Sequence, residues 1–580
     1  MRIKHFFGLA VLAAMTASCS SNNELVNGGN GSGENESGAS YASFSINLPT
    51  RSGTRAASDP TFDKGNAKEY DVFNATLLVF KEGTTAGEGN YTLAEKVDLG
   101  SMEPWKASSE TGVTTQAKIT AKLEKVDKNG KFFALVLLNN GSGTDAKVTL
   151  PSEGDKFSDW NVAAKANPDN FTDTKKGFYM ANAPLYNATD KNVTTLVAID
   201  KNKIFPTEAQ ASSGEAAADI YVERGLAKVT LTAATKDKKT VDASSSYAGD
   251  EVTINKWALD VTNKKTFPIH NVDGLSTEYE NIWKNEAAAA PSTQRFVDNS
   301  EAIAKRVYWG TDPNYKETTL SEETTESKNA RIKNFNYVKK GDLTADPKDP
   351  QYCLENTFNL ANMVQGQTTR VAFKGTYTPK SITPDENGTF YKIGKNVALW
   401  NSADLKKHIE AAVTKVVADA SAAGASTTIT LNGSDNDLTT AGNRMLTASN
   451  ITVTKATGDV VTLQPEDVKA INDKLGLSEG YGISTYEKGE SYYIARIKHF
   501  GDALTPWTSG VYGENNLAYL GRYGMLRNNW YELDVQNVSG PGYPDVPEVK
   551  PNTPDDEDDK YINVSVKILK WAKRSQTVDL

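Results

Sequence analysis

The residues best suited to catalytic or metal chemistry in this chain of 580 residues are its histidines and one serine between two glycines. His270, His408 and His499 lie far apart, in none of the spacings that gather imidazoles around a metal ion. Residues 476–480 read Gly-Leu-Ser-Glu-Gly, the spacing of a nucleophile turn, but they follow a predicted helix instead of joining a strand to a helix. A turn after that helix explains them. We predict no catalytic residue, no metal site and no cofactor.

Charge excludes one class of partner and accounts for an acidic cluster. The formal net charge is -9, whereas a nucleic-acid-binding protein needs a basic face, so we expect no nucleic-acid partner. The acidic run Asp555–Asp559 lacks the alternating ligands and the turn glycine of a calcium loop. It follows Pro551 and Pro554, and we interpret residues 551–560 as a solvated, self-repelling linker.

The N-terminus combines a targeting segment with a cysteine. A basic start and an apolar run at 6–14, too short to span a bilayer, are typical of a signal peptide, which we place at residues 1–18. Small residues from Thr16 onward precede Cys19, which resembles the lipobox of bacterial lipoproteins, although Thr16 stands where that box usually has leucine. The resemblance implies acylation of the Cys19 thiol, as with palmitate. An ordinary secretory signal with an incidental cysteine is the alternative.

Strand-like segments lie near both ends of the chain. In each of them apolar residues alternate with polar ones, the period of a strand that buries one face. The first segment carries Phe44, Ile46 and Leu48 after a flexible tether rich in Gly, Ser and Asn. The last segment, residues 561–580, follows the acidic linker, and its apolar residues are Ile562, Val564, Val566 and Ile568, with Trp571 out of phase beyond them.

Two arginines stand directly after the first strand-like segment. A protease that cuts after Arg55, before Ala56, would remove residues 19–55 and the strand within them; a cut between Arg51 and Ser52 is the second choice. The alternative is that both are ordinary loop arginines. A removed first strand leaves an open sheet edge, which the last strand of another copy can fill. The chain therefore suggests a subunit that polymerises by exchanging strands.

Between these ends the chain is predicted to be mainly β. A small, polar run at 208–219 resembles a connector, so we predict two β-sandwich domains, residues 56–218 and 219–550. Helices are expected at 402–420, capped by Ser402, and at 465–475. Short apolar runs separated by turn residues predict the strands, at 75–80, 132–138, 194–199, 221–231, 252–261, 491–500 and 530–538. Cys353 is expected to be a small core residue.

Short runs of residues in most of the chain carry a family likeness. They are Val222–Arg224, Ala227–Val229, Tyr352–Thr357, Arg522–Tyr531, Trp571–Arg574 and Val578–Leu580. Together they resemble the fimbrillins of Bacteroidales, the stalk subunits of type V pili, and especially the minor-fimbria branch. The likeness is strongest from Ser491 onward, whereas the N-terminal domain matches in style more than in motif.

The resemblance implies a fold and a route of assembly. It implies tandem transthyretin-like β-sandwiches and a precursor that is exported, lipidated on Cys19 and held at the outer membrane on the bacterial surface. An arginine-specific protease then removes the tether and first strand, and the groove accepts the donor strand, residues 561–580, of another copy. The expected partners are further copies in a head-to-tail fibre, anchor and tip pilins, and the protease.

Two other roles fit the same features. One is an accessory or tip pilin, which need not donate its last strand; the other is a surface adhesin lipoprotein that binds glycans. Aromatic residues suited to stacking on sugars occur near the C-terminus, and at least half of them are expected to be core residues because they alternate on strands. These aromatic residues are Trp507, Tyr512, Tyr519, Tyr523, Trp530 and Tyr531.

Overall fold

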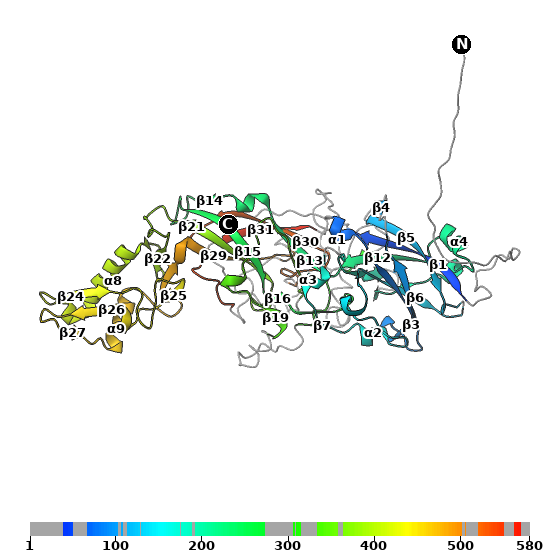
Figure 1. Cartoon of the computed structure of the whole chain (residues 1–580), viewed down its shortest axis with the longest axis horizontal. Helices are drawn as coiled ribbons and strands as arrows, with labels where there is room; N and C mark the ends of the chain where they lie inside the picture. The colour runs from blue at the N-terminus through cyan, green and yellow to red at the C-terminus, as the bar shows by residue number, and fades with distance from the viewer. Residues whose placement is uncertain are drawn as a thin grey trace, which may run out of the picture.

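A computed structural model describes most of the chain. The two β units and a smaller mixed module follow one another along the long axis of an elongated molecule (Figure 1). No helix among the described residues is long and apolar enough to cross a membrane. The described residues are 39–49, 67–102, 106–107, 113–127, 129–173, 176–187, 192–272, 305–307, 309–314, 333–357, 364–500, 505 and 520–549, together with the backbone of 562–569.

The N-terminal unit is a single sheet of nine strands that curls around a core. The strand order is β3-β2-β6-β8-β12-β1-β5-β4, and β11 adds to β6. The two ends of the sheet meet, because the Glu95 carboxylate of β3 accepts hydrogen bonds from the backbone N–H groups of Glu124 and Lys125, just after β5. The strands are β1 Ser40–Pro49, β2 Ala75–Lys81, β3 Thr92–Gly100, β4 Lys106–Ala107, β5 Val113–Leu123, β6 Phe132–Leu138, β8 Met180–Asn182, β11 Val197–Ala198 and β12 Ala218–Arg224.

Continuous apolar runs form the strands that are covered on both faces. In β2, Leu77 and Val79 point into the core that the sheet encloses. Leu78 and Phe80 point outward, into a second apolar layer to which the short helices α2 and α3 contribute. A strand buried on both faces needs apolar side chains at every position, which is why β2 and β6 do not alternate. The helices of this unit are α1 Ala67–Tyr70, α2 Phe157–Trp160, α3 Pro168–Phe171 and α4 Glu208–Ser213.

The C-terminal unit is a sandwich of two four-stranded sheets. Side chains from both sheets share one core, which includes Val229 and Leu533 from the first sheet and Trp257 and Phe373 from the second. The first sheet has the order β20-β13-β30-β31, and the second has the order β14-β15-β21-β29. Their strands are β13 Ala227–Leu231, β20 Gln351–Cys353, β30 Trp530–Val538, β31 Ile562–Leu569, β14 Lys239–Thr240, β15 Glu251–Asp260, β21 Arg370–Thr378 and β29 Glu490–Arg496.

A mixed module is inserted between β21 and β29 and has its own core. Helix α8, Ser402–Val416, directs Leu405, Ile409 and Val413 into that core at helical spacing. Helix α9, Pro465–Lys474, begins at a proline, which suits the first turn of a helix. The strands of the module are β22 Phe390–Ile393, β23 Leu399–Trp400, β24 Ser426–Ile429, β25 Gly442–Arg444, β26 Ile451–Thr454, β27 Val460–Val461 and β28 Ile483–Tyr486.

Short strands also connect the two β units. β7 pairs with β17 from the C-terminal unit, and β9 pairs with β18, so the junction has hydrogen-bonded ladders of its own. The bounds are β7 Ala164–Lys165, β9 Leu185–Asn187, β10 Asn192–Thr194, β16 Thr262–Asn263, β17 Lys265–Thr266, β18 Lys305–Arg306 and β19 Phe335–Asn336.

The predicted fold class is confirmed: the chain is mainly β, with sandwich-like and barrel-shaped units and helices inserted in the second half. Four local predictions were wrong. The expected strand at 194–199 is interrupted at 195–196, between β10 and β11. The expected strand at 221–231 is two strands, β12 and β13, because the chain turns between them at Gly225. The run at 208–219 is no plain connector, since it contains α4 and the start of β12. The cap of α8 is Asn401, whose side chain accepts from the N–H of Asp404.

The predicted domain boundary at 218/219 falls inside β12. The N-terminal sheet continues through this strand to Arg224, and the C-terminal unit begins at Ala227. Cys353 is fully buried, as expected for a core residue.

Candidate functional site

The first strand, β1, lies in the interior of the N-terminal sheet. It runs antiparallel to β5 along its whole length and parallel to β12 from Phe44 to Asn47. Its backbone groups are therefore shared between two neighbours that lie far apart in the sequence. Within the described part of the chain β1 is the one strand between β12 and β5, and it closes the sheet at this place.

Both faces of β1 are buried. The inner face carries Phe44, Ile46 and Leu48, each with no exposed area, in the core of the unit. The outer face carries Ser43, which is also completely buried. The alternation that predicted this strand is confirmed, but its polar side is covered and does not face solvent.

Helix α4 covers the outer face of β1. The Ser43 hydroxyl donates to the Ala211 carbonyl of α4 at 2.7 Å and shares a hydrogen bond of 2.8 Å with the Thr120 hydroxyl of β5. The Lys118 ammonium, also on β5, donates to the carbonyls of Ser212 and Gly214 and holds the end of α4 over the sheet. Helix α4 therefore limits the space available to side chains on the outer face of β1.

Loss of β1 would open a groove in the unit. The inner row of apolar side chains that includes Phe44 contributes on the order of 5–10 kcal/mol, at about 1.5–3 kcal/mol for each buried side chain. Facing backbone groups of β5 and β12 would lose their hydrogen-bond partners, and unpaired edges of this kind recruit other strands. The segment that fits this groove is an extended strand with one apolar and one polar face.

The last described strand, β31, lies at the edge of the first sheet of the C-terminal unit. Among the described strands it pairs with β30 alone, in antiparallel orientation. The register places Val564 opposite Val535 and Val566 opposite Leu533, so its apolar row matches buried residues of β30. Fewer hydrogen bonds must break when an edge strand with one neighbour leaves its sheet than when a central strand with two neighbours does.

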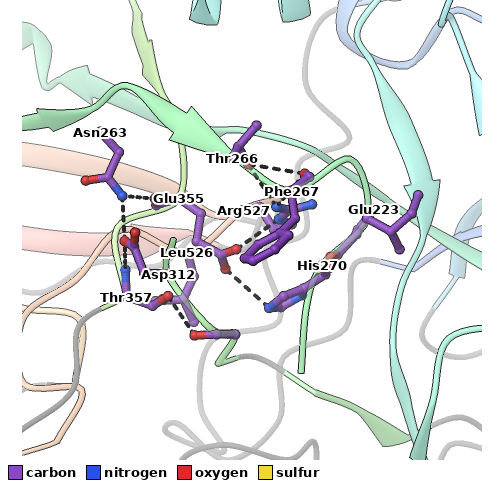
Figure 2. A network of polar contacts seen from close by, with 12 residues as sticks. Glu223, Asn263, Thr266, Phe267, His270, Asp312, Glu355, Thr357, Leu526 and Arg527 are labelled. Atoms are coloured by element: carbon purple, nitrogen blue, oxygen red, sulfur yellow. Dashed lines mark hydrogen bonds and ion pairs between the residues drawn. The ribbon is translucent and has the colours of Figure 1, made fainter. Parts of the chain in front are cut away.

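A buried network of charges joins the two β units. The His270 Nδ1 atom lies 2.9 Å from the Glu223 carboxylate of β12, and its Nε2 atom lies 3.3 Å from the Glu355 carboxylate. Arg306 forms an ion pair with Glu223, and Arg527 forms one of 3.0 Å with Glu355. Figure 2 shows His270, Glu355 and Arg527 converging from different segments.

Burial and neighbouring charges shift the pKa values of carboxyl groups in and near this network. Burial alone would raise the pKa of Glu223, but Arg306 and His270 beside it lower that pKa to about 2. Nearby, burial raises the pKa of Asp312 to about 7, although hydrogen bonds from Asn314 and Asn263 act in the opposite direction. Glu223 is thus held as a carboxylate, whereas Asp312 changes its protonation near neutral pH.

A second buried cluster lies on the other side of β12. The Lys228 ammonium of β13 pairs with the Glu69 carboxylate of α1 at 2.6 Å, and Tyr352 donates to the same carboxylate at 2.9 Å. The Arg224 guanidinium donates to the Glu69 carbonyl at 2.7 Å and to the Asn528 side chain at 3.1 Å. Buried ion pairs of this kind tolerate little relative movement, because separating them leaves charges without partners.

The two clusters gather residues that carried the family likeness in the sequence. Glu223, Arg224, Lys228, Glu355 and Arg527 come from four separate runs and meet at the junction of the units. Sequence reasoning missed this meeting, because charged residues in strands are ordinarily exposed. Strand β12 belongs to both features, since residues 218–221 line β1 and residues 223–224 hold the junction.

Several residues expected to act in lipidation, proteolytic processing or strand donation lie outside the described part of the chain. These are Cys19, Arg51, Ser52, Arg55, Ala56 and Trp571. The structure brings the expected removable strand, Phe44 to Leu48, into the sheet interior and places residues 562–568 in β31. The two strands lie in different units and do not contact each other within one sheet.

The serine and histidines that were considered for catalytic or metal chemistry lie in ordinary surroundings. Ser478 lies in an exposed turn after α9, with Gly476 and Gly480 at positive φ. His499 is buried against the Tyr531 hydroxyl, and His408 packs on the ring of Trp400. Among the described residues no group of His, Cys, Asp and Glu has the arrangement of a metal site.

Of the aromatic residues considered for sugar binding, Trp507, Tyr512 and Tyr519 lie outside the described residues. Tyr523 and Tyr531 are buried. The ring of Trp530 is covered by the Lys228 ammonium at 3.9 Å from its centre. Two of the three described aromatic residues are therefore core residues, and the partly buried ring of Trp530 already has a cation over it.

Comparison with known proteins gives one family match. Residues 484–577 match the family described as major fimbrial subunit protein type IV, fimbrillin, C-terminal. This stretch contains β30 and β31, and it confirms the likeness to fimbrillins read from the sequence. No curated protein sequence is recognisably similar to the chain.

Solved structures from Parabacteroides distasonis show distant similarity. One, provisionally named as a cell adhesion protein, has 10% identity and a TM-score of 0.37, and the match covers 93% of this chain and 99% of the other. A second protein with the same provisional name has 12% identity and a TM-score of 0.30, over 92% of this chain and 99% of the other. A fimbrial assembly protein has 11% identity and a TM-score of 0.22, over 39% and 64%.

Proposed function

Because the C-terminal region of this chain is that of a fimbrillin, we propose that the protein is a stalk subunit of a surface fimbria that polymerises by donor-strand exchange. Strand β1 is removed by proteolysis, and β31 of another copy takes its place between β12 and β5. A fimbrillin region favours a structural role over a catalytic one, and a fibre on the bacterial surface would support adhesion.

The observation that carries this proposal is the position of β1. It is the first described strand, it is buried on both faces, and candidate cleavage sites at Arg55 and Arg51 follow it in the sequence. A cut there separates β1 from the rest of the chain without breaking any other strand of the unit. Exchange from one copy to the next runs head to tail and does not close, so it yields a fibre.

The route of export belongs to the same proposal. The precursor is acylated on Cys19 and held by its lipid at the outer membrane until an arginine-specific protease cuts after Arg55, or alternatively after Arg51. Anchor and tip pilins would end the fibre. The cut releases the subunit from its lipid, which couples release to the opening of the groove.

The test is assembly of the purified chain without its signal peptide and without the lipidation residue Cys19, residues 20–580. It is treated with an arginine-specific protease, the new N-terminus is sequenced, and unheated samples are run in SDS. We expect a start at Ala56 and a ladder of SDS-resistant oligomers. An Arg55→Ala variant should shift the start to Ser52 or abolish the ladder, whereas Arg51→Ala should change neither.

A chain that ends at Lys560 is the matched control. It keeps both β units and the cleavage site but lacks β31, so it should be cut normally and give no ladder. A ladder from this shortened chain, or none from the cut full-length chain, would contradict strand exchange and favour an accessory subunit or an adhesin.

A further inference from the structure

The environment of β1 differs from position to position, and this allows the register of the incoming strand to be derived. We propose that β31 of a neighbouring copy enters the groove in a single register, with Ser565 in the place of Ser45. This inference rests on the exchange proposed above. It assigns a binding site to each donor residue, with the apolar row in the order Ile562, Val564, Val566 and Ile568 at the places of Ala42, Phe44, Ile46 and Leu48.

The direction of the donor follows from the hydrogen bonds of the groove. β1 is antiparallel to β5 and parallel to β12, and the two kinds of ladder space their N–H and C=O groups differently. A donor running the other way would face groups placed for the opposite pattern. We therefore take the donor to run in the direction of β1.

Alternation of side chains restricts the donor to shifts of two residues. A shift by one residue would turn the whole apolar row outward, beneath α4. A shift by two residues toward the N-terminal end of the groove would put Lys570 in the place of Leu48, and a shift toward the other end would put Lys560 in the place of Ala42. Both places are fully buried in the apolar core.

The cost of a charge in the core decides among these registers. An ammonium buried there without a partner is disfavoured by several kcal/mol even after local relaxation. In the proposed register Lys570 lies beyond the end of β1, while Lys560 and Lys567 take the places of Ser40 and Asn47. These two places are also buried, but they are polar, whereas Ala42 and Leu48 lie in the apolar core. The Ser40 hydroxyl donates to the carbonyls of Leu123 and Val126, so that place offers acceptors to an ammonium.

The polar face of the groove favours the same register. Ser45 accepts a hydrogen bond from the Gln116 side chain at 3.1 Å, which the Ser565 hydroxyl can replace. Ser43 donates to the Ala211 carbonyl, and the Asn563 amide can make that donation. Lys567 takes the place of Asn47, whose amide already donates to the Ile220 carbonyl at 3.4 Å, so an acceptor is present there.

The two shifted registers fail on this face as well. One would place Leu569 at Asn47, where the surroundings are polar. The other would place Tyr561 at Ser43, where α4 and the Thr120 hydroxyl leave room for a small side chain. The proposed register alone keeps each apolar donor residue on an apolar place and each polar one on a polar place.

The apolar donor residues differ in size from the β1 residues that they would replace. This difference suggests variants that test the register. Val564 leaves a gap at the place of Phe44, while Ile562 adds volume at the neighbouring place of Ala42. A Val564→Phe donor should fill the gap and form ladders at least as stable to heat in SDS. A Val566→Phe donor would meet the smaller place of Ile46 and should lose ladder stability, because overpacking a core is destabilising.

Disulfide formation between two copies measures the register directly. In β5, Gln116, Lys118 and Thr120 face Asn47, Ser45 and Ser43 in that order. A cut donor with Ser565→Cys is mixed in turn with acceptors carrying Gln116→Cys, Lys118→Cys or Thr120→Cys and then oxidised. We expect the Lys118→Cys acceptor to give several-fold more cross-linked dimer than the other two, because directly opposite residues are closest.

Native thiols do not interfere with this experiment. The proposed cut removes Cys19, and Cys353 is fully buried, which raises its pKa to about 12 and leaves it inert. Reduced samples of all three mixtures must show the ladder, which controls for damage to β5 by the substitutions.

Each outcome has one meaning. Strongest cross-linking at residue 118 supports the register, and strongest cross-linking at 120 or 116 overturns it in favour of one of the shifted registers. A ladder without any cross-link overturns the register while leaving strand exchange intact. Absence of a ladder in all mixtures, the unsubstituted chain included, overturns strand exchange and this inference with it.

Discussion

The first and the last strand of the described chain are held in opposite ways. β1 lies between two strands, with an apolar row in the core on one face and α4 on the other. β31 lies at a sheet edge and has β30 as its single neighbour. Similar alternating sequences thus occupy a closed position in one unit and an open position in the other.

This difference gives strand exchange a direction. An edge strand can leave while the sandwich behind it stays paired, but a central strand leaves two unpaired edges and an opened core. The open groove is therefore the stronger binding site, and the edge strand is the segment more easily given up. The junction between the two β units carries buried ion pairs on both sides of β12, and relative movement of the units would separate these charges.

The largest effect is expected from a substitution in β1 that tests whether this strand is absent from the fibre. Phe44→Ala should lower the free energy of unfolding of the uncut chain by about 3–5 kcal/mol, because it leaves a cavity in the core. The same change should leave the assembled fibre unaffected, since the fibre no longer contains β1. The measurements are denaturant unfolding of residues 20–580 and the temperature at which ladders dissociate in SDS.

Leu77→Ala is the control for this prediction. Leu77 lies in the same core but on β2, which is present before and after cleavage. It should destabilise the uncut chain and the fibre alike. If Phe44→Ala weakened the fibre as much as Leu77→Ala does, β1 would still be in place in the fibre.

A second prediction concerns Asp312, near the junction of the two β units, and uses pH. The folded pKa of Asp312, about 7, lies above the value near 3.9 expected for the unfolded chain. Between these values the folded state holds an extra proton, so the free energy of unfolding should fall as pH rises from about 4 to 7, by at most about 4 kcal/mol. Unfolding in denaturant at pH 4.5 and 7.5 measures this slope.

Asp312→Asn should flatten the slope, because an amide does not titrate in this range. Glu223 supplies a contrast, because its pKa is lowered to about 2. Its contribution to the free energy of unfolding is therefore present above about pH 4 and is lost only in stronger acid. A slope that survives Asp312→Asn unchanged would show that Asp312 is ionised throughout and that the junction does not respond near neutral pH.

The sequence revealed the two strands but not the difference between them. The alternation at Phe44, Ile46 and Leu48 follows from one buried face, and it is the same for a central and an edge strand. The central place of β1 depends on β12, whose partner residues begin at Ala218, far along the chain. Such non-local pairing leaves no periodic signal in the sequence.

The cover over β1 and the buried charges were harder to foresee. The small, polar residues of α4 resemble a loop, and Thr207, whose hydroxyl caps the helix, was the one local signal for it. Glu223 and Lys228 alternate with apolar residues as exposed charges would. Only the fold shows that each has a partner. In the sequence, the likeness of these runs to a known family was the sole sign that they matter.

The smallest effect is expected from a substitution in β31 that tests whether this strand is bound more tightly in the fibre than in its own unit. Val566→Ala removes two methyl groups, which contribute about 1–2 kcal/mol where they become buried. In the uncut chain this loss should be small, because an edge strand has one neighbour and can fray. In the fibre the residue would lie in the groove between two neighbours, so the temperature at which ladders dissociate should fall by more than the melting temperature of the uncut chain does.

The matched change for this prediction is Val535→Ala on β30, directly opposite Val564. Val535 stays in its own unit before and after assembly, so its substitution should lower the stability of the uncut chain and leave contacts between subunits intact. Equal effects of the two substitutions on the uncut chain, with no change in the ladder from Val566→Ala, would mean that β31 is a permanent strand of its own sheet. The contrast between the first and last strands would then be one of position alone, and the groove would need a different donor.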